Sequence, residues 1–172
     1  MKKLVTFIIF SMLLCITSLA QTAKIEFVCR KGNSIEYEYG KYTSIDNSYK
    51  FVTVRPTNWE TRGYVYMGAN YCRPTKIEGD LQAVTDEVLK KYPNEKFPKE
   101  LSMEIFFTLQ KETVAVEFSY NSSTWEIISP YFLEDLTKAI LKTRKLVGLK
   151  FFGTKPEFPI YGITETATVK LR

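Results

Sequence analysis

Carboxylates are the side chains of this chain that could do acid–base chemistry, because the sequence contains no histidine. That absence excludes Ser-His-Asp and Cys-His catalytic groups and the usual zinc sites. Two carboxylates at a defined separation can cleave a glycosidic bond, and Glu26, Glu36 and Glu38 lie within one short stretch. Alternating glutamates are also typical of the solvated face of a strand. The sequence has no glycine-rich phosphate loop either, so we expect a protein without enzymatic activity, cofactor or metal.

The cysteines offer a different chemistry, a disulfide. Cys15 lies inside an apolar segment and does not follow the small residue that lipid attachment requires, which leaves Cys29 and Cys72. In an exported protein an even number of cysteines predicts a bridge between them. The alternative is two buried free thiols, since cysteine is among the most buried residue types.

The first twenty residues indicate the compartment. Two lysines precede an apolar run over residues 4–19, which ends in the small-x-small triplet Ser18-Leu19-Ala20. This pattern predicts a signal peptide over residues 1–20 that is cleaved after Ala20. The run is shorter than the roughly 20 residues that span a bilayer, so we expect no transmembrane anchor after cleavage. The expected location is the periplasm or the exterior of a Gram-negative bacterium.

Length and composition after cleavage suit one compact body. The chain is 45% hydrophobic and 15% aromatic, which is enough apolar side chain for a core. We divide it into an N-terminal β-rich part, residues 21–91, and a C-terminal part, residues 92–172. The formal net charge of +5 does not indicate nucleic acid in an exported protein; at most it favours anionic glycans or lipid headgroups.

Hydrophobic alternation predicts four strands in the first half. Residues 24–30 and 34–40 alternate with a period of two around a Gly-Asn turn, which is typical of a hairpin. Residues 50–55 and 62–68 are expected to form a second pair. Asp80 then has the character of an N-cap for an amphipathic helix over 81–91.

The second half shows the same pattern twice more. Residues 101–109 and 114–120 predict a hairpin that turns at Lys111-Glu112. Pro130 suits the first turn of a helix, which Gly148 is expected to end, and residues 161–171 alternate as a last strand. The predicted fold class is therefore α+β, with antiparallel sheets, two helices and a C-terminal strand-strand-helix-strand unit.

Residues 92–172 carry a family resemblance. Tyr92-Pro93 ahead of the hairpin, the helix after "ISPYFLEDLTKAI" and the terminal strand resemble the C-terminal domain of TonB. The resemblance implies that a partner peptide adds as a strand beside the last strand. A TonB transducer also keeps a membrane helix and a proline-rich stretch, which this chain is expected to lack, so we expect binding without force transmission. The candidate binding residues on the last strand are Ile163, Glu165, Thr166 and Thr168; the alternative is an ordinary strand with a threonine-rich solvent face.

Two further features could contribute to binding. Lys142, Lys145 and Lys150 belong to a run without acidic residues, which favours acidic partners, although basic residues at a helix end also complement its dipole. Trp59 lies in a polar loop, where it is either a contact residue or folded back onto the body. We therefore expect an exported binding protein whose partner is a protein or peptide segment; the alternatives are an envelope glycan-binding protein and a structural envelope protein.

Overall fold

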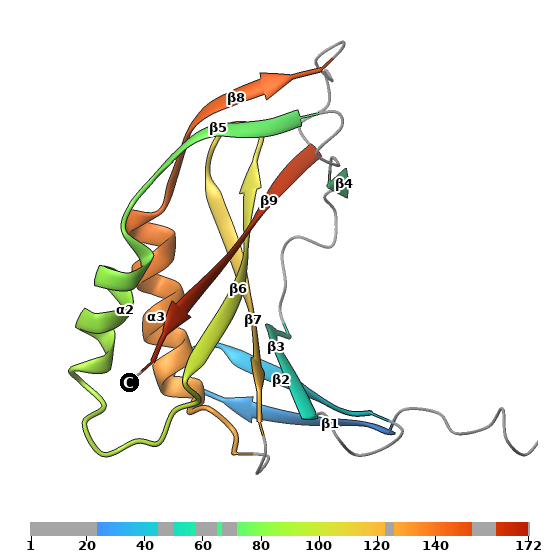
Figure 1. Cartoon of the computed structure of the whole chain (residues 1–172), viewed down its shortest axis with the longest axis vertical. Helices are drawn as coiled ribbons and strands as arrows, with labels where there is room; N and C mark the ends of the chain where they lie inside the picture. The colour runs from blue at the N-terminus through green and yellow to red at the C-terminus, as the bar shows by residue number, and fades with distance from the viewer. Residues whose placement is uncertain are drawn as a thin grey trace, which may run out of the picture.

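The computed structural model of the chain describes residues 24–44, 50–57, 65–66, 72–122, 126–152 and 161–171. Figure 1 shows the arrangement of the secondary-structure elements in these residues. The elements, in chain order, are β1 (Lys24–Lys31), β2 (Glu36–Thr43), β3 (Lys50–Pro56), β4 (Val65–Tyr66), β5 (Cys72–Glu78), α2 (Leu81–Leu89), β6 (Glu100–Thr108), β7 (Thr113–Asn121), α3 (Pro130–Thr143), β8 (Lys145–Phe151) and β9 (Tyr161–Lys170). Neither α2 nor α3 has the length and apolar character of a membrane-spanning helix.

The strands of the described residues form two sheets. The larger sheet has seven strands in the order β1-β2-β3-β7-β6-β9-β4, and β5 and β8 form a separate two-stranded ribbon. All pairings are antiparallel except that of β4 with β9. The predicted α+β class with antiparallel sheets and two helices is therefore confirmed.

The core lies between the larger sheet and the two helices, which cover one of its faces (Figure 1). Tyr39, Val54, Phe118 and Met103 are in register across four neighbouring strands, and all four are buried. Because antiparallel partners point to the same face, this row forms one wall of the core. The helices supply the opposite wall, and the buried apolar residues of α3 are Phe132, Leu133, Leu136 and Ile140.

The helix starts follow the sequence signals. Asp80 caps α2, since its carboxylate accepts a hydrogen bond from the backbone N–H of Ala83 at 3.1 Å. Pro130 occupies the first turn of α3. The expectation that Gly148 ends this helix is wrong: α3 ends at Thr143, and Gly148 lies within β8.

Two strand pairings differ from the expectation. The predicted pair of 50–55 with 62–68 is wrong, because β3 pairs with β2 and β7, whereas β4 pairs with β9. In addition, β8 lies between α3 and β9 in the chain and pairs with β5. The pairing of β3 with β7 joins the two halves of the chain in one sheet.

Glu134 of α3 is fully buried and holds the turn between β1 and β2. Its carboxylate accepts hydrogen bonds from the backbone N–H of Ser34 at 3.0 Å and of Ile35 at 3.2 Å, and from the Ser34 hydroxyl at 2.6 Å. Lys138, one helical turn later, donates at 2.5 Å. A Cβ atom on Gly32 would collide with the same carboxylate. Burial alone would raise the pKa of Glu134, but these donors outweigh burial and lower the pKa to about 2.

Glutamine at position 134 should therefore destabilise the fold. We expect E134Q to reduce the free energy of unfolding at neutral pH by about 1–3 kcal/mol, because the donors lose a charged acceptor. A carboxyl group whose folded pKa lies below its unfolded value stabilises the protein above the unfolded pKa. The wild type should thus lose this stability as the pH falls from about 4.5 towards 2.

Denaturant unfolding of both proteins across that pH range measures the difference. The acid-dependent loss should be smaller in E134Q, and E87Q is the control, because the Glu87 carboxylate pairs with Lys90 at the surface and contributes little. An unchanged acid slope in E134Q would contradict this account of the carboxylate.

Candidate functional site

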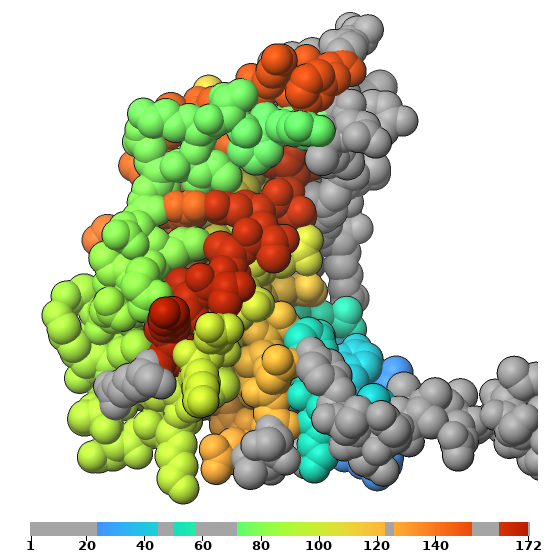
Figure 2. All heavy atoms as spheres, in the orientation of Figure 1, coloured from blue at the N-terminus to red at the C-terminus, as the bar shows by residue number. Residues whose placement is uncertain are grey.

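The candidate site is the outer edge of β9. This strand pairs with β6 from Gly162 to Lys170, and on its other side β4 pairs with Tyr161 and Gly162. In the described part of the chain no further strand lies along that outer side. Figure 2 shows β9 running across the surface beside α2. Among the described residues, the edge is therefore open in its middle and bounded at its start.

Gln82 of α2 shows which backbone groups face outward. Its side-chain nitrogen donates to the carbonyl oxygen of Lys170 at 2.9 Å, and its side-chain oxygen accepts from the backbone N–H of Lys170 at 2.9 Å. The Lys170 backbone therefore points away from β6. Because the direction alternates along a strand, the N–H and C=O groups of Thr164, Thr166 and Thr168 point outward too.

The paired bonds of Gln82 reproduce the contact that a residue of an added strand would make. A carboxamide presents a donor group and an acceptor group side by side, as the backbone of a strand residue does. Gln82 thus ends the open part of the edge at Lys170, just as β4 ends it at Gly162. Three outward-facing residues remain between Gln82 and β4.

A shallow hollow of about 330 Å³ adjoins the Gln82 end of the edge. It lies between the exposed side of α2 and the end of β9, and its lining residues are Gln82, Asp86, Leu89, Lys90 and Lys170. Leu89 supplies an apolar floor, since it is 5% exposed. Gln82 also donates to Asp86 at 2.8 Å, which orients its amide. The hollow can take one side chain or chain end of mixed apolar and polar character.

An ion pair fixes β9 from the helix side. The Arg144 guanidinium makes a two-pronged contact with the Glu165 carboxylate, with its Nε atom 2.9 Å from Oε2, and it also donates to the carbonyl oxygen of Gly79. The two side chains are 13% and 17% exposed. Arg144 therefore ties β9 to the segment that precedes α2, and this contact helps to set the position of the edge beside the helix.

The predicted binding residues on β9 divide into two groups. Ile163 is 2% exposed and belongs to the core, and Glu165 is engaged by Arg144. These two side chains are not available to a partner. Thr166 and Thr168 are exposed on the other face of the sheet, where the Thr168 hydroxyl lies 3.1 Å from that of Ser102.

The predicted basic residues lie elsewhere. Lys142 is in the last turn of α3, whereas Lys145 and Lys150 lie on β8, opposite Glu78 and Arg73 of β5. The ring of Phe152 lies 5.3 Å from both Arg73 Cζ and Lys150 Nζ, which offsets the repulsion between these two cations. The basic character is thus a property of the β5–β8 ribbon rather than of the β9 edge.

Trp59 lies outside the described residues. Tyr37 and Tyr39 are fully buried, and their hydroxyls bond to Thr137 and to the carbonyl oxygen of Ile128 at 3.2 and 2.8 Å. These two tyrosines are core residues and are not available to a glycan.

The three early glutamates do not converge on one site, because Glu36 and Glu38 share one face of β2 whereas Glu26 lies on the other face of the sheet. Glu26 lies opposite Lys41 and Glu38 lies opposite Cys29, so the two carboxylates are on opposite faces of the sheet. Glu38 accepts from Arg55 at 2.8 Å. Glu36 accepts from the Thr57 hydroxyl at 3.2 Å.

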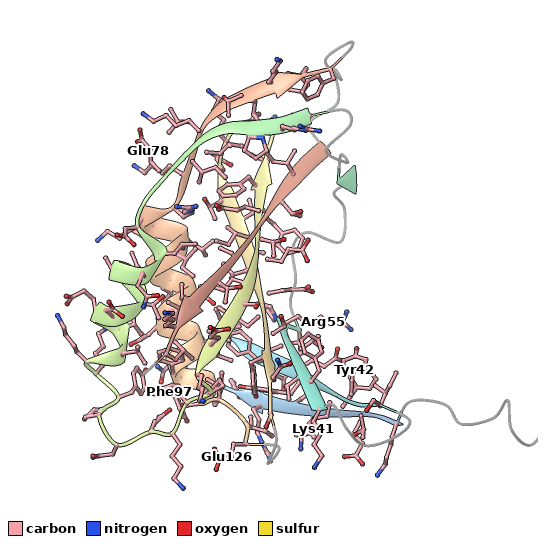
Figure 3. The ribbon with its side chains drawn as sticks, in the orientation of Figure 1. Lys41, Tyr42, Arg55, Glu78, Phe97 and Glu126 are labelled. Atoms are coloured by element: carbon pink, nitrogen blue, oxygen red, sulfur yellow. The ribbon has the colours of Figure 1, made fainter. Side chains whose placement is uncertain are left out.

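A different carboxylate pair lies on the open face, which is the face opposite the helices. Figure 3 shows Arg55 on that side. Glu104 and Glu117 are directly opposite each other on β6 and β7. Burial, followed by the charge of Glu104, raises the pKa of Glu117, while Arg55 acts against this shift. This pair was not predicted from the sequence, because the alternation along β6 and β7 was used only to identify the residues that face the core.

The predicted disulfide is wrong for this structure. Cys29 and Cys72 are both free thiols. Cys29 is exposed on β1, whereas Cys72 is buried on β5 opposite Phe151, and Figure 1 shows these strands at opposite ends of the molecule. A bridge requires Cα atoms within about 7 Å. The alternative prediction, two buried free thiols, is correct for Cys72 but not for Cys29. Burial raises the pKa of the Cys72 thiol.

Comparison of the chain with protein families, with characterised proteins and with solved structures finds no match.

The two thiols should differ in reactivity. In protein that starts at Gln21, we expect one thiol to react rapidly with a chromogenic disulfide reagent and the second to react only after unfolding, because Cys72 is 2% exposed. C29S should remove the rapid phase and C72S the slow one. If the unfolded, unreduced protein shows no reactive thiol, the two cysteines are bonded in solution and this assignment fails.

Proposed function

We propose that this protein is an exported, non-catalytic binding protein of the cell envelope that captures an extended segment of a partner protein by strand addition at β9. The observation that carries the proposal is the open run of outward backbone groups at Thr164, Thr166 and Thr168. Each of these residues offers one donor and one acceptor to an incoming strand.

The two ends of the open run define the register of the partner. A strand that pairs with Thr164 and Thr168 ends beside Gln82, so its last side chain enters the hollow between α2 and β9. Main-chain bonds then supply affinity, and the hollow supplies selectivity. The acidic preference expected from Lys142, Lys145 and Lys150 is not part of this site, because those lysines belong to α3 and β8.

Export is part of the proposal and rests on residues 1–20, which lie outside the described part of the chain. The native protein should begin at Gln21 and carry no lipid, because the small-x-small triplet ends at Ala20 and Cys15 lacks a lipid-attachment context. Intact-mass analysis of protein isolated from its natural source measures both features. A retained Met1 or a mass increment of a diacylglycerol group would contradict this prediction.

Proline at Thr166 should abolish strand addition. The outward N–H of Thr166 makes no bond to β6, so T166P should fold normally, as proline is tolerated at the outer side of an edge strand. The missing donor and the added ring should weaken peptide binding roughly tenfold or more. T166V is the matched control, since it keeps the N–H and the β-branched shape and should bind as the wild type does.

Peptides selected on the wild type from a displayed random library provide the probe. Binding is measured by calorimetry for the three proteins, and amide exchange should show protection at Thr164, Thr166 and Thr168 when peptide binds. Equal affinity of folded T166P and wild type would exclude β9 as the binding edge.

A further inference from the structure

The other free edge of the larger sheet is β1. This strand pairs with β2 through all eight of its residues, from Lys24 opposite Thr43 to Lys31 opposite Glu36, with no shift in register. It is the first strand of the sheet, and among the described residues no strand pairs with its outer side. It contains neither proline nor a bulge, which are two of the devices that protect edge strands.

The turn after β1 fixes which backbone groups face outward. The backbone N–H of Gly32 donates to the carbonyl oxygen of Ile35 at 2.8 Å, so Gly32 points towards β2. By alternation, the backbone groups of Ile25, Phe27, Cys29 and Lys31 point away from the sheet. The N–H of Thr57, which donates to the carbonyl oxygen of Glu36 at 2.8 Å on the far side of β2, agrees with this alternation.

Apolar side chains lie along the same edge. Ile25 and Phe27 are 49% and 59% exposed, among the largest exposed apolar residues in the described part of the chain. Both are on the open face of the sheet. A Cβ atom on Gly40 would lie 3.2 Å from the Phe27 ring and 3.1 Å from the Tyr42 ring, so glycine lets these rings rest on the strand. Figure 3 shows Tyr42 on the side away from the helices.

We propose that the occupant of this edge is the β1 strand of a second copy of the chain, which pairs antiparallel about a two-fold axis at Val28. In this register Phe27 lies opposite Cys29 of the second copy, and Ile25 lies opposite its Lys31. These are the residues whose backbone groups face outward. The two sheets then continue as one, with the helices of both copies on the same side.

Charge selects this register. It places Glu26 of each copy opposite Arg30 of the other, which gives two complementary pairs across the axis. Shifting the axis to Phe27 would instead place Lys24 opposite Arg30, which is repulsive, and shifting it to Cys29 would leave Glu26 opposite Gly32. In the free chain Glu26 contacts Lys24 at 2.5 Å, with both side chains largely exposed, so little is lost when Glu26 turns to the second copy.

Self-complementarity also closes the assembly. If β1 paired with β9 of the next molecule, the contact would be heterologous and would produce open chains. A strand that pairs with its own copy uses the same patch twice and stops at a dimer. It leaves the β9 edges of both copies free.

Sedimentation equilibrium of the wild type, E26R and R30E tests the proposal. The wild type should be a dimer in reversible exchange with monomer. In a dimer of E26R, the arginine at position 26 lies opposite Arg30 of the other copy. In a dimer of R30E, the glutamate at position 30 lies opposite Glu26. Each variant alone should therefore dimerise roughly tenfold more weakly or worse. An equimolar mixture of the two variants should restore dimers, because arginine then meets glutamate at both positions.

Both variants should fold, because positions 26 and 30 are exposed. The mixture is the decisive comparison, since only the proposed register restores both charge pairs in it. A monomeric wild type across the accessible concentration range overturns the proposal. So does a wild-type dimer that is unaffected by either substitution, or a mixture that stays monomeric. Assemblies that grow beyond the dimer would indicate heterologous pairing and overturn the two-fold arrangement.

A cysteine cross-link tests the register. Val28 meets itself at the axis in a non-hydrogen-bonded pair, whose Cα atoms lie about 4.5 Å apart, a spacing that suits a disulfide. V28C in a C29S background should therefore form an intermolecular bridge under mild oxidation. Wild-type Cys29, which lies opposite Phe27, should remain a thiol. The reverse result would place the axis at Cys29 and overturn the register proposed here.

Discussion

The ladder between β3 and β7 is the interaction on which the arrangement of the larger sheet depends. It has four residue pairs, from Phe51 opposite Asn121 to Val54 opposite Phe118, and it joins β1, β2 and β3 to the strands of the second half. Without it the hairpin of β1 and β2 would have no sheet to extend. Because β3 takes this position, β1 becomes one boundary of the sheet, and β9 with the short β4 becomes the other. Both candidate interaction edges therefore follow from one short pairing.

Glu134 acts together with that ladder. The ladder fixes β3, β2 and β1 as neighbours, but it does not fix how far the outer hairpin twists relative to the helices. The buried carboxylate bonds the turn residues Ser34 and Ile35 to α3, so the far end of the hairpin is held against the helix layer. A carboxylate without such partners would be costly in the interior. With these partners, Glu134 links α3 specifically to the turn between β1 and β2, which lies about 100 residues earlier in the sequence.

Local patterns predicted much of the fold. A period of two identified β1, β2, β6, β7 and β9, and Asp80 and Pro130 marked the helix starts. What failed was partner choice. The strand at 50–55 alternates well, but nothing in its sequence distinguishes residues 62–68 from β7 as a partner, because pairing is decided by the whole sheet. The strand β8 was missed because Lys145 to Phe151 follows the helix directly, and its basic residues were assigned to the helix end.

Only part of the candidate site was predicted, again because the missing features depend on contacts between residues far apart in the sequence. The last strand was recognised as a strand and as an edge, yet the two features that limit it, Gln82 and β4, come from distant segments. Gln82 meets Lys170 across 88 positions of sequence, and β4 is two residues long. Side chains such as Ile163 and Glu165 were expected at the surface, but alternation alone does not tell which face a second layer of structure covers. The helices decided that question.

The position of β9 has a consequence for how the chain folds. β6 lies between β7 and β9, yet β9 is made after every other strand of the sheet. Until residues 161–170 emerge from the ribosome, the side of β6 that pairs with β9 has no partner strand. Closure of the sheet then requires contacts between residues far apart in sequence, which is slow. The export proposed above requires a chain that is still unfolded when it crosses the membrane, and late closure favours that state. The unfinished β6 edge is then the region that most needs a chaperone.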